Sequence, residues 1–258
     1  AIVSHRIRRS NVTFPLPKDL SCSVSCPPSK VRIFGVLGDT RSPPRGLSMS
    51  RETKRFKASV LSLATFDASS AREAYASAEP YAHGVVTELG IPSKMKAVRR
   101  ELVEHLTAKY KESDLFKVYQ TMDLGNLRLA EHRDLAEKLP VTMALLDELY
   151  GPSFRDFISK TTGCKPLSGT NQDCSANVYM KGGHLLCHDD VIGSRAVSYI
   201  IYLTDDEAWS QADGGSLELY ALDGPAQPAF NPARGILPTF NTMAFFAVQP
   251  GVSYHQVQ

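Results

Sequence analysis

The stretch HLLCHDDVIGSRAVSYIIYL, residues 184–203, decides the fold class. Its second half is rich in β-branched and aromatic residues, and a period of two puts Ser198, Ile200 and Tyr202 on one face of a strand. Its first half carries two histidines and two aspartates on a segment that we predict to be extended. The stretch therefore predicts a β-strand beside a segment whose side chains can bind a metal or a small ligand.

Four further strand-like runs surround this stretch and are separated by glycine, proline and aspartate pairs. The runs are residues 175–180, 216–222, 242–248 and 252–257. Upstream, three amphipathic helices are expected: one with Ser93 as its N-cap, one after Pro140, and one between Pro152 and Gly163. Helices followed by many short strands predict an α+β fold, with N-terminal helices packed outside a β-sandwich or barrel.

The composition excludes several classes of protein. The 258 residues are 43% hydrophobic and 22% charged, with 17 Gly and 16 Pro, as in an ordinary globular chain. No apolar run approaches the roughly 18 to 20 residues of a membrane span, so no membrane association is expected. Five Cys, an odd number without regular spacing, argue against a secreted disulfide framework and indicate a reducing compartment.

Residues 1–55 differ in charge from the rest of the chain. They carry 11 Lys and Arg against 3 Asp and Glu, whereas residues 56–258 carry 18 against 24. We predict a basic Ser/Arg/Pro-rich leader over 1–55 and a single domain over 56–258. The leader is typical of an organelle transit peptide, although a flexible basic tail or translated upstream sequence has the same composition. The acidic body favours basic partners, so no direct nucleic-acid readout is expected.

The spacing of His188 and Asp190 suggests a metal site. On an extended segment, positions i and i+2 point to the same face, so the imidazole and the carboxylate can bind one divalent metal. His255, in the last strand-like run, is the candidate third ligand of a 2-His-1-carboxylate face with open coordination positions. Asp189 is expected on the opposite face, as a solvated carboxylate.

Other interpretations of these residues stay open at this point. An H-x-D pair is common by chance, and an isolated histidine such as His188 is more often a core or surface residue. His184 and His188 have the spacing of a helical zinc-protease pair, but the residues between them lack the catalytic Glu. Buried Tyr179 and Tyr202 hydroxyls need a partner, which a ligand carboxylate or an ordinary backbone hydrogen bond could supply.

The longer sequence resembles a known family. Four segments carry the resemblance: SDLFKVYQTMDLGNL (113–127), NVYMKGGHLLCHDDVIGSRAVSYIIYL (177–203), DGGSLELYALD (213–223) and FNTMAFFAVQPGVSYHQV (240–257). They are similar to the Fe(II)/2-oxoglutarate-dependent ribosomal prolyl 3-hydroxylases, the family of the yeast termination-and-polyadenylation protein. The resemblance covers roughly residues 80–258.

The resemblance implies a double-stranded β-helix (jelly-roll) core. It implies His188, Asp190 and His255 as iron ligands, and Tyr179 and Tyr202 as contacts to 2-oxoglutarate. The implied cofactors are Fe(II), 2-oxoglutarate and O2, with ascorbate in support. The implied reaction is hydroxylation at C3 of a prolyl residue, once or twice, in a small-subunit ribosomal protein of the decoding centre. A nuclear or cytoplasmic location follows, with organelle import through the leader as the other expectation.

Two other functions are compatible with these residues. One is a non-catalytic jelly-roll module that binds a ribosomal or translation factor. The other is a metal-dependent dioxygenase that uses the same triad without 2-oxoglutarate. Conversion of 2-oxoglutarate to succinate separates the three functions.

The resemblance has one serious departure. Family members place an Arg about a dozen residues after the distal histidine, on the last core strand, where it pairs with the far carboxylate of 2-oxoglutarate. The sequence given ends at Gln258, three residues after His255. We therefore expect a domain that is incomplete at its C-terminus, without the family's second jelly-roll domain, and that binds 2-oxoglutarate weakly.

Overall fold

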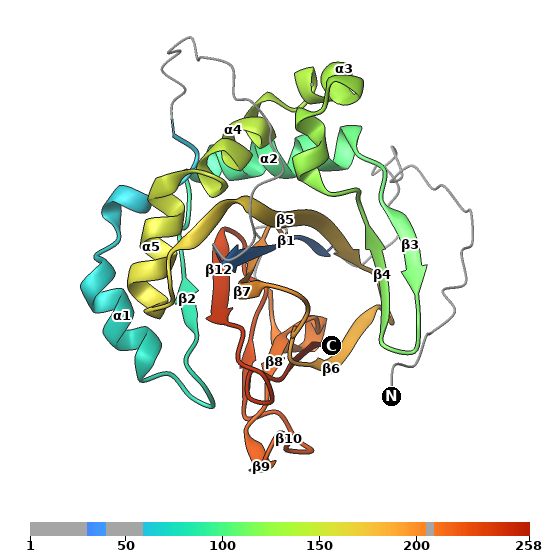
Figure 1. The fold of residues 1–258 in the computed structure, drawn as a ribbon. Coiled ribbons are helices and arrows are strands. Elements are labelled where there is room, and N and C mark those ends of the chain that lie inside the picture. The colour runs from blue at the N-terminus through green and yellow to red at the C-terminus, as the bar shows by residue number, and fades with distance from the viewer. Residues whose placement is uncertain (1–29, 40–58, 205–208) are drawn as a thin grey trace.

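The computed structural model describes residues 30–39, 59–204 and 209–258. One sheet of eleven strands has the order β11-β8-β13-β6-β4-β5-β1-β7-β12-β2, with β3 paired to β4 outside this path. The sheet curls back on itself, and the helices cover the outer side of one half (Figure 1). This curled antiparallel sheet with helices outside confirms the predicted α+β jelly-roll class.

The bounds of the elements are as follows. The strands are β1 Lys30–Asp39, β2 Gly84–Val86, β3 Lys109–Glu112, β4 Phe116–Gln120, β5 Leu167–Tyr179, β6 His184–His188, β7 Arg195–Tyr202, β8 Leu217–Leu219, β9 Leu222–Gly224, β10 Gln227–Pro228, β11 Arg234–Ile236, β12 Thr242–Ala247 and β13 His255–Val257. The α-helices are α1 Ala68–Ala76, α2 Pro92–His105, α3 Arg133–Glu137, α4 Pro140–Leu149 and α5 Pro152–Thr162. Four short 3-10 helices complete the described segments: Leu63–Thr65, Leu124–Arg128, Ala130–His132 and Gln211–Asp213.

Proline and glycine residues mark the ends of the helices. Helix α5 starts at Pro152 and ends before Gly163, which has φ 72°, so the predicted start and stop are both confirmed. The predicted N-cap Ser93 is wrong, because Pro92 takes the first helical position of α2 and Ile91 becomes the N-cap. Among the described helices, none combines the length and apolarity that a bilayer crossing needs.

The sheet has two faces with separate apolar cores. The outer face packs against the helices and includes Val197, Tyr199 and Ile201 of β7. The inner face lies inside the curl and includes Ile200 and Tyr202 of the same strand, together with Tyr179, Leu219 and Phe246. The alternation predicted for residues 197–203 is therefore present, and it divides each central strand between the two cores.

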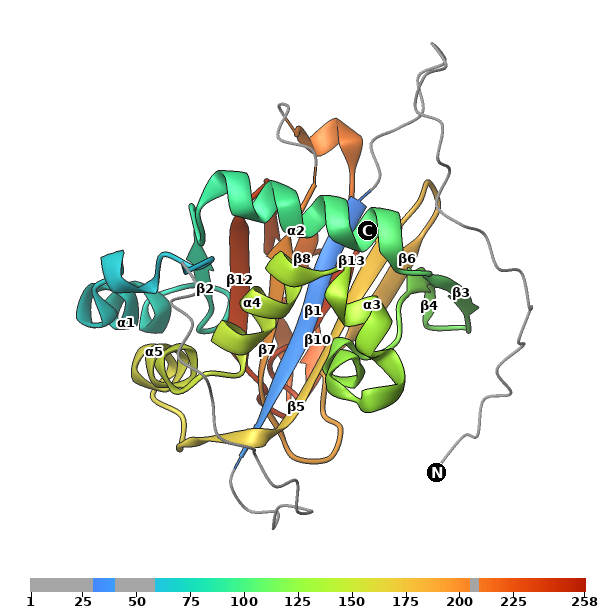
Figure 2. The ribbon, with the colours of Figure 1, turned by 90° about the horizontal axis from the view of Figure 1, so that it is seen from above.

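Strand β1 lies in the middle of the sheet, between β5 and β7 (Figure 2). Val31, Ile33 and Leu37 are buried in the outer core. Gly35 lies opposite Tyr199, and any Cβ at this position would collide with the tyrosine ring, so only glycine fits. The predicted leader boundary at residue 55 therefore differs from the structure, because β1 belongs to the domain. The other leader residues, 1–29 and 40–55, lie outside the described residues.

Candidate metal centre

Strands β6 and β13 bring two predicted site residues together. They pair antiparallel with His255 opposite His188, and the ring centroids are 4.2 Å apart. Asp190 follows β6: its Oδ1 lies 3.3 Å from Nε2 of His188, and its Oδ2 lies 3.5 Å from Nε2 of His255. One ligand atom from each side chain lies within 4.8 Å of the others. These three residues form the triad that the sequence predicts to converge.

The backbone conformation at Asp190 differs from the extended one that was predicted. The extended segment stops at His188, and Asp190 has φ 59°, in the left-handed region that aspartate tolerates better than most residues. Its carboxylate is held by Ser198, whose Oγ donates to Oδ2 at 2.7 Å, and by Arg195, whose Nη1 donates to Oδ1 at 2.9 Å. Such conformations persist where surrounding contacts hold them, often at functional sites.

Backbone carbonyls orient both histidines. Nδ1 of His188 lies 2.8 Å from the oxygen of Leu186, and Nδ1 of His255 lies 2.9 Å from the oxygen of Ser253. A carbonyl can only accept, so each Nδ1 carries a proton, and in the neutral ring Nε2 keeps the lone pair. Both Nε2 atoms face the Asp190 carboxylate. This tautomer is the one that binds a metal through Nε2.

The pKa directions agree with a metal-binding donor set. Burial alone would raise the pKa of Asp190, but the hydrogen bond with His188 and the proximity of both imidazoles hold it well below its usual range. Burial and the neighbouring His188 lower the pKa of His255 to about 4, so this ring is neutral near pH 7. Burial opposes protonation of His188, but Asp190 raises its pKa. One carboxylate and two imidazole nitrogens suit Fe(II) and comparable first-row metals.

Asp189 points away from the triad, as expected, but is not simply solvated. Its Oδ2 accepts from the backbone N–H of Gly251 at 3.0 Å, and its backbone oxygen accepts from Ser253 Oγ at 3.3 Å. The residue therefore ties the end of β6 to the turn before β13. The expectation of a solvated carboxylate is wrong, because the β12–β13 turn covers this side.

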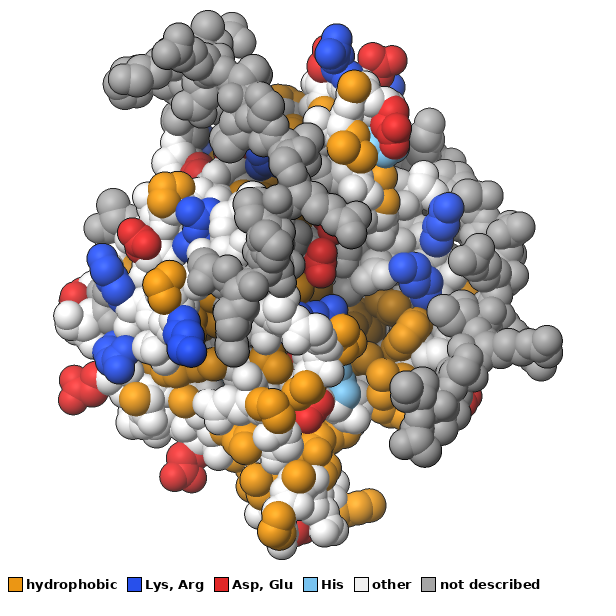
Figure 3. Space-filling model, in the orientation of Figure 1, with side chains coloured by type: hydrophobic (Ala, Val, Ile, Leu, Met, Phe, Trp, Pro, Cys, Tyr) orange, Lys and Arg blue, Asp and Glu red, His pale blue; other side chains and the backbone are white. Residues whose placement is uncertain are grey.

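Two cavities lie at opposite ends of β6 and β13. The triad cavity, about 430 Å³, is lined by all three triad residues and by Asn177 and Ser198. Figure 3 shows a hollow beside a histidine, bordered by apolar side chains, on the face seen in Figure 1.

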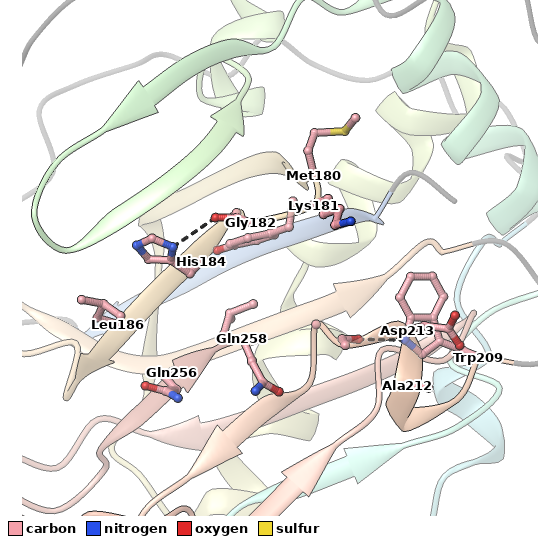
Figure 4. A pocket seen from close by; sticks show the side chains of 15 residues that line it. Met180, Lys181, Gly182, His184, Leu186, Trp209, Ala212, Asp213, Gln256 and Gln258 are labelled. Carbon is pink, nitrogen blue, oxygen red and sulfur yellow. Dashed lines mark hydrogen bonds between the residues drawn. The ribbon is translucent and has the colours of Figure 1, made fainter. Parts of the chain in front are cut away.

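The end cavity, about 800 Å³, lies where β6 begins and β13 ends (Figure 4). His184, Trp209 and Gln258 line it. Tyr179 also lines the end cavity, whereas Tyr202 lines neither cavity. Both tyrosines lie on the inner face of the sheet, and their implied contact with 2-oxoglutarate stays a prediction. His184 is on a strand, so the helical zinc-protease pair is absent.

Arg32 is a fully buried cation between Tyr179 and Tyr202 that the sequence interpretation missed. Its guanidinium carbon lies 5.0 Å from the ring centre of Tyr179 and 5.2 Å from that of Tyr202. Its Nη2 donates to the backbone oxygen of Gly215. The alternation of Val31, Ile33 and Leu37 is the signal that could have identified a strand here.

Comparisons with known proteins find similar sequences. Residues 174–258 match the 2OG-Fe(II) oxygenase superfamily. The chain is 47% identical over 180 residues to the prolyl 3,4-dihydroxylase OGFOD1 of Ostreococcus tauri, covering 69% of this chain and 35% of that protein. It is 31% identical over 178 residues to the prolyl 3-hydroxylase OGFOD1 of Xenopus laevis, covering 69% and 32%. The chain spans about a third of the length of these relatives.

A solved structure is also similar. The Pseudomonas putida prolyl-4-hydroxylase aligns with 74% of this chain and 90% of its own, at 19% identity and a TM-score of 0.42.

Proposed function

We propose that the chain is an Fe(II)- and 2-oxoglutarate-dependent dioxygenase that hydroxylates a prolyl residue, since residues 174–258 match the 2OG-Fe(II) oxygenase superfamily. The convergence of His188, Asp190 and His255 is the observation that carries this proposal. The prolyl hydroxylase relatives support the reaction class and a protein substrate.

The triad would hold the iron through two imidazole nitrogens and one carboxylate oxygen. When bound, iron with 2-oxoglutarate and O2 supplies the oxidising power to hydroxylate an unactivated C–H bond. The protein's own residues keep the donors in place. The Leu186 and Ser253 carbonyls fix the imidazole tautomers, while Ser198 and Arg195 fix the carboxylate. Three protein ligands leave the other coordination positions open for co-substrates.

The surroundings of the triad suit an extended peptide. The triad cavity opens to the surface, and its outer wall includes Lys111, Gln120 and Asp173. Val191 and Ile192, which directly follow Asp190, are exposed apolar residues. A prolyl ring can pack against apolar side chains while the peptide backbone bonds to polar groups at the rim.

The substrate and the location extend this proposal. The substrate would be a small-subunit ribosomal protein of the decoding centre, hydroxylated at C3 of a proline, and the protein would act in the nucleus or cytoplasm. The named activities of the OGFOD1 relatives support prolyl C3 as the target. Localisation of a fluorescent fusion, with and without residues 1–29, tests the location and any import signal.

A peptide assay tests the proposed reaction. The chain, Fe(II), ascorbate and 2-oxoglutarate are incubated with a proline-containing peptide of the ribosomal protein, and peptide mass and succinate are measured. We expect the peptide to gain the mass of one or two oxygen atoms, in step with succinate. An unmodified peptide that nevertheless binds the chain would favour the non-catalytic binding module.

A further inference from the structure

A row of buried polar side chains crosses the inner face of the sheet. Asn177 on β5, Arg32 on β1 and Tyr202 on β7 are direct cross-strand neighbours, and each is at most 5% exposed. Four of their polar atoms have no hydrogen-bond partner among the described residues: Nε and Nη1 of Arg32, Oδ1 of Asn177 and the hydroxyl of Tyr202. Buried polar groups are nearly always hydrogen-bonded, so a row of unsatisfied ones points to a ligand.

The charge of Arg32 indicates what kind of ligand the row fits. Taking a guanidinium out of water costs several kcal/mol unless a charge pairs with it. Its contacts in the described chain are one neutral carbonyl, that of Gly215, and the rings of Tyr179 and Tyr202. Burial lowers the pKa of Arg32, which reflects the same cost. An anion with planar acceptor oxygens, such as a carboxylate, would pair with the guanidinium and accept from the Tyr202 hydroxyl.

The position of the row relative to the triad indicates the size of the ligand. Ser198, which holds Asp190, and Tyr202 lie four residues apart on one face of β7, or about 13 Å along the strand. Between them lies Ile200, opposite Phe34 of β1. A small molecule with one polar end at the triad, an apolar middle and a carboxylate at the other end matches this order of groups.

We propose that Arg32, assisted by Asn177 and Tyr202, receives the 2-oxoglutarate carboxylate that lies far from the metal. This inference rests on the proposed function, because it takes 2-oxoglutarate as co-substrate. It assigns to β1, near the start of the sequence, the cation that the resemblance places beyond His255. It also replaces the expectation of weak binding, since the residues given already contain a buried cation for this carboxylate.

Calorimetry on the Mn(II)-loaded chain tests the assignment without any turnover. The two probes are 2-oxoglutarate and 2-oxobutyrate, which has the same keto-acid head but no distal carboxylate. The unaltered chain should prefer 2-oxoglutarate. Arg32→Met should weaken 2-oxoglutarate binding roughly 30-fold to a few thousand-fold and remove the preference, while 2-oxobutyrate binding stays unchanged. Arg32→Lys, which keeps the charge but loses the planar fork, should fall in between.

A matched control and a second variant keep the test independent of folding. Arg128 also lies over a tyrosine ring, 5.1 Å from the centre of Tyr150, but it pairs with Asp147 on the surface. Arg128→Met should leave both affinities unchanged. Asn177→Asp keeps Arg32 and adds a carboxylate beside it, which should compete with the ligand and weaken 2-oxoglutarate binding. Circular dichroism and Mn(II) binding by electron paramagnetic resonance verify the fold and the triad of each variant.

The outcomes separate this inference from the proposed function. If the unaltered chain binds no Mn(II), the triad is not a metal site, and both the proposed function and this inference fall. If Mn(II) binds and Arg32→Met keeps the full preference for 2-oxoglutarate, the inference alone is overturned. A lost preference in both Arg32→Met and Asn177→Asp, with Mn(II) binding retained, supports it.

Discussion

The outer and inner faces of the central sheet are made from alternate residues of the same strands, yet they differ in kind. On β1, Ile33 is buried against apolar neighbours under the helices, while the adjacent Arg32 is buried among polar atoms without partners. On β7, Tyr199 packs on Phe154 of α5, while Ser198 holds the triad carboxylate. Both faces have an apolar core, but the inner face also includes the triad support at Ser198 and the buried polar row with Arg32. Mutations at two adjacent residues of one strand are therefore expected to affect different properties: stability at the outer residue and ligand binding at the inner one.

The largest effect is expected on the inner face, at the triad. His188→Ala removes one of three metal ligands, and metal assistance worth several kcal/mol corresponds to at least about a thousandfold in rate. The free energy of unfolding should change little, since His188 lies outside both apolar cores. Succinate formation measures the loss of rate, Mn(II) binding measures the loss of the metal ligand, and urea unfolding measures stability. Activity retained at His188→Ala would mean that the metal is held elsewhere.

The next largest effect is expected on the outer face. Phe154 is fully buried, and its ring centroid lies 5.5 Å from that of Tyr199. Phe154→Ala should lower the free energy of unfolding by about 3–5 kcal/mol through lost burial and the resulting cavity. Mn(II) affinity of the remaining folded protein should be unchanged. A large loss of Mn(II) affinity in folded Phe154→Ala would show that the two faces are energetically coupled.

A smaller effect of opposite sign is expected at Tyr202. Its buried hydroxyl has no partner in the described chain, so Tyr202→Phe should raise the free energy of unfolding by about 1 kcal/mol without ligand. With 2-oxoglutarate, the lost hydrogen bond of about 0.5–1.5 kcal/mol should weaken binding roughly two- to tenfold. Denaturant unfolding of this variant measures the gain in stability, and calorimetry measures the loss of 2-oxoglutarate affinity. Destabilisation of the ligand-free protein would indicate that the hydroxyl has a structural partner.

The smallest expected effect is on stability at alkaline pH, and it is absent at neutral pH. Burial raises the pKa of both Tyr179 and Tyr202 to about 12, although Arg32 opposes the rise. The folded protein thus holds these protons more tightly than the unfolded chain, where tyrosine has a pKa of about 10. Their contribution to stability is therefore complete below about pH 10 and is lost as pH rises towards 12. Unfolding midpoints from pH 8 to 12 should fall less steeply for Tyr202→Phe than for the unaltered chain. Equal slopes would assign the alkaline sensitivity to other groups.

Local patterns account for much of the fold. The two-residue period of β7 correctly divides its residues between the two faces, and Pro152 with Gly163 marks both ends of α5. These features depend on neighbouring residues alone, so a single sequence contains them. Local patterns only suggested His255 as a candidate third ligand, and the resemblance strengthened that choice, since pairing of β6 with β13 is a long-range property.

The errors come from residues whose roles depend on distant partners. The basic composition of residues 1–55 concealed β1, because an arginine in a basic segment is typical of exposed chain. Its burial becomes understandable only with β5 and β7 on either side. Asp189 was expected in solvent because its partner, the N–H of Gly251, lies in a distant turn. Neither contact leaves a trace in local sequence.

The central place of β1 also has a consequence for the order of folding during synthesis. Arg32 precedes its hydrogen-bond partner Gly215 by 183 residues. At about 5–20 residues per second, roughly 10 to 40 seconds separate their synthesis. During most of this interval the apolar stripe of Val31, Ile33 and Leu37 has no sheet to join, because the neighbouring strands β5 and β7 are made only from residues 167 and 195 onwards. Such long-range pairing closes slowly and late. We therefore expect the nascent chain to depend on chaperones that shield this stripe until β7 is complete.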